Sequence, residues 1–104
     1  MPEPLSCADF QPHVHTIFQI ELPMALEVEL AAVTDNSNQQ VEQFSLLFLG
    51  PMSSPLRQGT YAFFHPKMGR QEIFIVPIGP QDGKMAYEAV FARLIGNPVR
   101  PPQM

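Results

Sequence analysis

Three histidines are the residues of this sequence with the greatest capacity to bind a metal ion. His13 and His15 stand two residues apart, so on an extended chain both imidazoles would share a face, and His65 could supply a third nitrogen. Three protein nitrogens are the ligand set of many catalytic zinc sites. Pro12 disturbs the backbone beside the pair, however, and nothing in the sequence brings His65 to the same place. We therefore predict no bound metal ion and no cofactor, with these three histidines as the weak candidates for ligands.

Cys7, the single cysteine, is the candidate nucleophile. A thiol attacks as its thiolate, which requires a neighbour that lowers its pKa. No cationic residue stands near Cys7 in the sequence. We predict that Cys7 is a small buried side chain without a catalytic role.

Glu27 and Glu29 could be read as a pair of catalytic carboxylates. Acid–base catalysis needs a cleft and a raised pKa, whereas acids that alternate with Val28 on a strand normally face solvent. The glycines are isolated in the sequence and form no phosphate-binding loop. These observations predict a protein that is not an enzyme, and a hydrolase or metal enzyme is the less favoured alternative.

Composition excludes some classes of partner. The net charge is −4, and the six lysines and arginines are spread singly, so the sequence lacks the basic patch of a nucleic-acid-binding protein. Charged residues make up 15% of the chain, against about 25% in typical domains. So few charges suggest that a partner, or a second copy, covers part of the surface.

The targeting signals expected of exported or membrane proteins are absent from the sequence. No apolar run approaches the ~20 residues of a membrane-spanning helix. The first residues, Met1 to Pro4, have no cationic region followed by an apolar stretch. We predict a cytoplasmic location, with an extracellular or virion-like assembly as the alternative.

Hydrophobic alternation predicts strands as the main elements. The clearest pattern is in 25–33, where Leu26, Val28 and Leu30 alternate with the two glutamates. Helices are the alternative for 25–33 and 85–94, but alternation and the preceding turn favour strands. The other predicted strands are 16–22, 44–49, 61–65 and 72–76. Many of the twelve prolines mark turns and strand ends, and Pro77 indicates either an edge position or a strand end.

These elements predict a mainly all-β fold. About six short strands separated by turns are typical of a small antiparallel β barrel or sandwich. A short helical turn should begin the domain within 6–14, with Ser6 as its cap and Asp9 completing a capping box. We predict one β domain over residues 5–95 and a Pro-rich extended tail over 96–104.

The aromatic residues exceed what one small core can hide. Most of them must be buried, because they are the largest apolar side chains in a chain without tryptophan. The alternate positions Ala62, Phe64, Phe74 and Val76 would then form an apolar face that needs a covering surface.

Several motifs together resemble one family of small bacterial domains of unknown function. The resemblance covers about residues 5–93, and it is carried by Asp9-Phe10-Gln11-Pro12-His13-Val14, Phe44-Ser45-Leu46-Leu47-Phe48 with Gly50-Pro51, Gln58-Gly59-Thr60-Tyr61 with His65-Pro66, and Tyr87-Glu88-Ala89-Val90-Phe91. Such domains are often encoded beside phage-tail-collar-type proteins, so the resemblance implies a link to tail-fibre-like assemblies and supplies no catalytic residues. The family usually has glycine at the position of His15, so a positive φ there would strain this residue.

The function expected from these observations is a non-catalytic structural or protein-interaction module. A subunit of a tail-collar-type fibre, or an accessory to one, is its concrete form, with strand addition or self-association as the mode of binding. A small-molecule-binding β barrel is the alternative. Loops at the sheet ends are the expected contact sites, and their candidate residues are Arg57, Gln58, Lys67 and Arg70.

Overall fold

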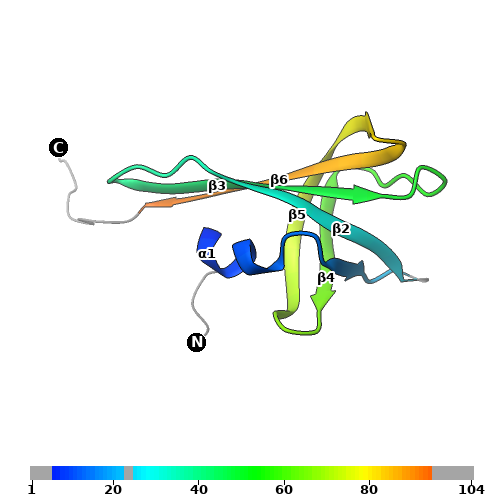
Figure 1. The fold of residues 1–104 in the computed structure, drawn as a ribbon, viewed down its shortest axis with the longest axis horizontal. Helices are drawn as coiled ribbons and strands as arrows, with labels where there is room; N and C mark the ends of the chain where they lie inside the picture. Colours follow the sequence, from blue (N-terminus) through cyan, green and yellow to red (C-terminus); the bar gives the residue numbers. More distant parts are fainter. Residues whose placement is uncertain (1–5, 23–24, 95–104) are drawn as a thin grey trace.

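The chain forms a six-stranded antiparallel barrel preceded by a short helix. We describe it from a computed structural model, in which residues 6–22 and 25–94 are placed. In chain order the elements are α1 (Cys7–Phe10), the 3₁₀ turn η1 (Gln11–His13), β1 (Ile17–Ile20), β2 (Leu26–Asp35), β3 (Val41–Gly50), β4 (Gly59–His65), β5 (Gly69–Gln81) and β6 (Lys84–Leu94). The strands close in the order β1-β2-β3-β6-β5-β4, so the barrel, and not the sandwich, is the architecture (Figure 1). The predicted Pro-rich tail over 96–104 lies outside the described residues.

Two segments that could have been helices are strands. In β2 the side chains of Val28 and Leu30 are buried, while Glu27 is exposed. In β6 Tyr87 and Ala89 are buried, while Glu88 between them faces outward. The period of two therefore predicted both elements correctly. Within the described residues, no helix has the length and apolarity needed to cross a membrane.

β5 is much longer than the sequence predicted. The sequence indicated either an edge position or a strand end at Pro77, and a turn over 79–83, whereas β5 continues through Pro77 to Gln81. The reason is that β5 pairs with β4 only as far as Ile75 and with β6 only from Val76 onward. At Pro77 one edge of β5 therefore has no partner strand. Proline has no N–H to donate, and at an unpaired edge this costs no hydrogen bond between strands.

The second half of β5 is shaped by a bulge and a tight turn. The register shifts between Pro77 and Gly79, and Gly79 has φ 111°, which favours glycine. Asp82 and Gly83 then connect β5 to β6 with φ values of 54° and 77°. Two positive φ values in a two-residue loop are typical of a type I′ hairpin turn. The predicted turn is thus confined to these two residues.

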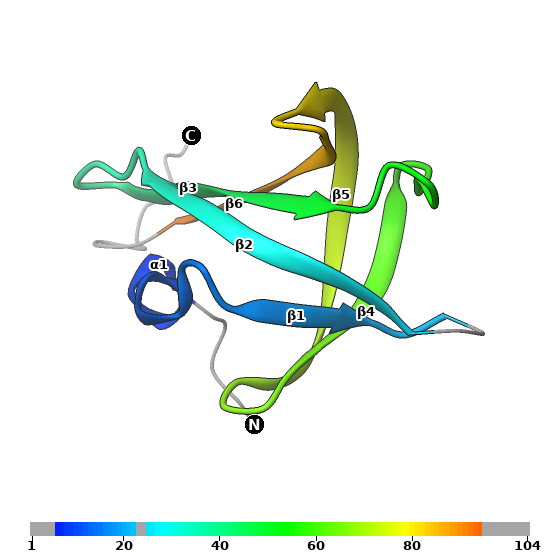
Figure 2. The same cartoon turned by 45° about the vertical axis from the view of Figure 1, so that its right-hand side comes forward.

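The short N-terminal helix lies across one end of the barrel. The carboxylate of Asp9 accepts a hydrogen bond from the Ser6 N–H at 2.7 Å, which confirms this part of the predicted capping box. Phe10 is fully buried, with its ring centroid 5.9 Å from that of Phe44 and 5.7 Å from that of Phe91. Both views place α1 beside the end of the barrel where β2 and β3 extend (Figure 1 and Figure 2).

Large side chains fill the middle of the barrel. Phe18, Phe48 and Phe63 are all buried, and the ring of Phe48 contacts the other two, with centroid distances of 5.5 Å to Phe18 and 4.9 Å to Phe63. Side chains thus occupy the interior, as is usual for barrels with few strands.

Candidate functional site

Two of the three histidines meet beside the closed end of the barrel. His13 ends η1 and His65 ends β4, and their ring centroids lie 4.5 Å apart. The ring of Phe18 contacts the other side of His65, also with a centroid distance of 4.5 Å. The fold therefore brings together residues that are far apart in the sequence.

His65 is a buried histidine whose two ring nitrogens both have hydrogen-bond partners. The backbone N–H of Lys67 donates to Nδ1 at 3.0 Å, so this nitrogen carries a lone pair. The hydroxyl of Thr16 donates to the carbonyl of His13, so it accepts from the N–H at Nε2 of His65, 3.0 Å away. These partners select the neutral ring with its proton on Nε2.

Its surroundings also oppose a positive charge on His65. Burial lowers the pKa of His65, and the nearby charges of His13 and Lys67 lower it further. With both nitrogens already bonded, the ring has no free lone pair for a metal ion. The chemistry open to His65 is a change of protonation state.

A shallow pocket of about 550 Å³ opens beside this pair of histidines. Its walls come from the N-terminal segment, the start of β1 and the β4–β5 turn, and its lining residues are Pro12, His13, Thr16, Ile17, His65, Pro66 and Lys67. The lining is mainly apolar, with the imidazole of His13 and the ammonium of Lys67 as polar groups. We assign no ligand to it.

His15 is turned away from the other two histidines. Its Nδ1 lies 3.3 Å from Oε2 of Glu29, and the imidazole is largely exposed. The backbone of His15 has φ 72°, a left-handed conformation that glycine adopts more easily than histidine. Within residues 6–22 and 25–94, no group of three or more histidine, cysteine or acidic residues is arranged to hold a metal ion.

Cys7 lies in the hydrophobic core at the start of α1. Burial raises the pKa of its thiol, and the negative charges of Asp35 and Glu42 raise it further. The side-chain amide of Gln11 lies 3.4 Å from the sulfur. The thiol is therefore held in its protonated form, which is a poor nucleophile.

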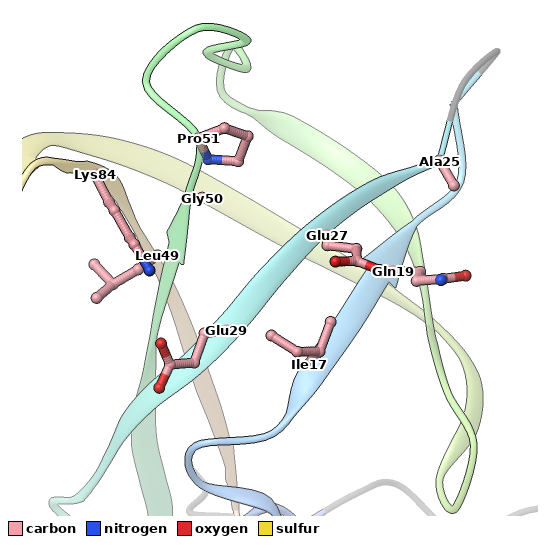
Figure 3. A pocket seen from close by; sticks show the side chains of 9 residues that line it. All are labelled: Ile17, Gln19, Ala25, Glu27, Glu29, Leu49, Gly50, Pro51 and Lys84. Carbon is pink, nitrogen blue, oxygen red and sulfur yellow. The ribbon is translucent and has the colours of Figure 1, made fainter.

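The two glutamates of β2 border a second open pocket on the outside of the barrel. Figure 3 shows Glu27 and Glu29 on either side of Ile17, with Lys84 on the far side near Leu49. Glu27 is exposed, and the carboxylate of Glu29 faces His15. These are the surroundings of solvated acids and not of a general acid in an apolar cleft.

The four predicted contact residues occupy opposite ends of β4. Arg57 and Gln58 precede the strand, and the carbonyl of Arg57 accepts a hydrogen bond from the hydroxyl of Tyr61 at 2.8 Å. Lys67 lies in the turn after β4, and Arg70 pairs with Glu21 at 3.2 Å. The structure thus gives these residues no common surface.

The most exposed apolar side chains gather on β5 and β6. Among the large hydrophobic residues of the described chain, Val90 (59% exposed), Ile78 (52%) and Phe74 (51%) are the most exposed. The pairing of β5 with β6 ends at Val76 and Glu88, and its continuation would set Phe74 opposite Val90. We call the separating segments, residues 69–75 of β5 and 89–94 of β6, the β5–β6 fork.

The fork also contains an unpaired strand edge. β3 bonds one side of β6 along its length, from Met85 to Leu94. On the other side, no strand of the described chain pairs with β6 beyond Glu88. Figure 2 shows β5 and β6 running in different directions from their shared turn.

Sequence reasoning identified only part of this apolar face. Of the predicted positions, Phe64 and Phe74 are exposed, while Ala62 and Val76 are half-buried. Val90 was missed, although its alternation with Ala89 and Phe91 was a usable signal. The fork itself was not predictable, because strand pairing is set by the whole barrel.

Comparison with known proteins identifies the family of the chain. The family described as "Domain of unknown function (DUF6916)" matches residues 5–91. No curated protein and no solved structure matches the chain. The match spans most of the barrel, including the histidine pair and β6 as far as Phe91. The chain therefore belongs to the DUF6916 family.

Proposed function

We propose that this protein is a non-catalytic interaction module that binds a second copy of itself through the β5–β6 fork. The observation that carries the proposal is that two of the three most exposed large apolar side chains, Val90 and Phe74, lie on the fork with its unpaired strand edge. Unpaired N–H and C=O groups along an edge favour the addition of another strand. Covering the exposed half of a side chain such as Phe74 contributes on the order of 1 kcal/mol.

A second copy suits this edge because its sequence can pair with itself. Residues 89–92 read Ala-Val-Phe-Ala and contain no charge. Two such strands can run antiparallel about a two-fold axis without opposing like charges. The filled interior of the barrel supports this module over the alternative of a small-molecule-binding barrel.

The test is the molar mass of the purified protein from low micromolar to millimolar concentration, by light scattering and analytical ultracentrifugation. We expect a dimer whose dissociation constant rises at least about tenfold on Val90→Lys, because a lysine at an edge opposes strand addition. Met52→Lys is the matched control, since Met52 is 44% exposed but lies in the loop after β3. A monomer at every concentration, or equal weakening by both substitutions, would contradict the proposal.

A tail-collar-type protein is the other candidate for the same fork, on the strength of the family resemblance alone. Such a protein would be the partner of the fork if it binds the monomer, if Val90→Lys abolishes this binding, and if Met52→Lys leaves it intact. If neither substitution changes the affinity for this partner, the binding surface lies elsewhere on the barrel.

A further inference from the structure

Among the described residues, His65 is the one buried side chain that is polar or charged, at 4% exposure. Its ring lies between the rings of His13 and Phe18. It therefore connects three elements: η1 through His13, β1 through Phe18, and β4, to which it belongs. A change in its charge would be felt by all three.

The hydrogen bonds of His65 tolerate only the neutral ring. A second proton would sit on Nδ1, where the Lys67 N–H now donates, and two donors would then face each other. At the other nitrogen, the Thr16 hydroxyl links His65 to the carbonyl of His13. Protonation of His65 thus breaks the bond to the β4–β5 turn, while the N–H at Nε2 still donates to the Thr16 hydroxyl.

The charged and titratable neighbours do not offset the proton. His13 on η1 and Lys67 in the β4–β5 turn are the groups whose charges act on His65, and both oppose a positive imidazole. Thr16 and Phe18, the contacts before and within β1, carry no charge. The ring of His13 lies 4.5 Å from that of His65, so moving η1 away relieves the repulsion between His13 and a protonated His65.

We propose that His65 is a pH-sensitive latch that holds residues 6–16 across the end of the barrel, and that protonation of its ring releases this segment. In the latched state Phe10 is fully buried against Phe44 and Phe91. Release uncovers the inner faces of β3 and β6 at those two rings. Phe91 belongs to the β5–β6 fork, but the latch does not require association through the fork.

The direction of the pH dependence follows from the pKa of His65, which folding lowers from its ordinary value of about 6.5. Above that value both the latched and the released state hold a neutral ring, and the latch is at full strength. As the pH falls below it, the released state binds the proton more readily than the latched state. The equilibrium constant for release then rises by up to about tenfold per pH unit, until the pH passes the lowered pKa.

The test is amide hydrogen exchange of residues 7–14 between about pH 5 and pH 7.5, corrected for the intrinsic pH dependence, with the ring titrations of all three histidines followed by NMR. In the native protein we expect release to follow the titration of His65. His65→Gln, which keeps an N–H for Thr16 but binds no proton, should make release independent of pH.

His15→Gln is the matched control, and it should leave the pH response unchanged. Release that follows His13 or His15 in the native protein, or exchange that does not change with pH, would overturn the proposal. These measurements are made on the native protein, so they test the proposal even if the His65→Gln variant fails to fold.

Discussion

The left-handed backbone of His15 is the clearest point of local strain in the chain. At φ 72° a Cβ meets the following carbonyl, which costs about 1–2 kcal/mol. The contact with Glu29 offsets little of this, because exposed pairs contribute about 0.2–1 kcal/mol. Glycine adopts this φ without that cost, because it has no Cβ.

The first prediction follows from that strain. His15→Gly should give a protein about 1 kcal/mol more stable to urea than His15→Ala. Both substitutions remove the imidazole and its contact with Glu29, so their difference isolates the Cβ. An alanine variant as stable as the glycine variant would show that this backbone is not strained.

Two tyrosine hydroxyls provide a second prediction at the residue scale. The hydroxyl of the buried Tyr87 accepts the Leu56 N–H at 2.8 Å, and it anchors the loop after β3. Tyr87→Phe should cost about 1–3 kcal/mol of unfolding free energy, because that N–H loses its acceptor.

The matched control is Tyr61→Phe. Its hydroxyl donates to the carbonyl of Arg57 at 2.8 Å in an exposed position, where water can replace it. Its cost should stay within about 0.5 kcal/mol. Equal losses in the two variants, measured by denaturant unfolding, would contradict the role given to the Tyr87 hydroxyl.

At the scale of elements, the side chain of Val28 on β2 fills the space beside Gly50 at the end of β3. A Cβ on this glycine would lie 2.9 Å from Cγ1 of the buried Val28, closer than the packing allows. The glycine is therefore required by the approach of its neighbour and not by its φ.

Gly50→Ala should accordingly destabilise the protein by about 1–3 kcal/mol through overpacking. Val28→Ala makes room for the new methyl, so its own cost should be smaller in the Gly50→Ala background by about 1 kcal/mol or more. Thermal or urea unfolding of the four proteins of this cycle measures the coupling. Strictly additive losses would mean that the two residues do not meet.

Features set by the local sequence were predictable, whereas features set by how the strands pair were not. Alternation within one strand is local, so the residue pattern alone assigns Val28 and Tyr87 to the correct face. The sequence left two readings of Pro77 open, an edge position or a strand end, because the choice depends on whether both edges of β5 are paired at that residue. The contact between His13 and His65 could not be predicted from the sequence, since it depends on how the barrel closes.

For the whole molecule, the barrel is closed by a short seam. β1 and β4 pair only through Gln19–Phe64 and Ile20–Phe63, with a further bond from the Glu21 N–H to the Ala62 carbonyl at 2.8 Å. The seam between β3 and β6 is continuous from Val41–Leu94 to Gly50–Met85. The strand pairings that close the barrel therefore differ greatly in length.

This inequality predicts where the barrel opens. The amide of Glu21 should exchange with solvent on the order of tenfold faster or more than that of Phe48 in the centre of β3, because a short seam opens without global unfolding. Native-state hydrogen exchange at neutral pH measures both. Equal protection would mean that the barrel opens only as a unit.

β5 pairs first with β4 and then with β6, and this has a consequence for which sequence changes the family can tolerate. Each part of β5 has one unpaired edge, so a further proline whose N–H would face that edge removes no hydrogen bond between strands. β3 has no such freedom, because β2 and β6 bond both its sides from Phe44 to Leu49. Additional prolines among relatives should therefore occur in β5 and not in β3.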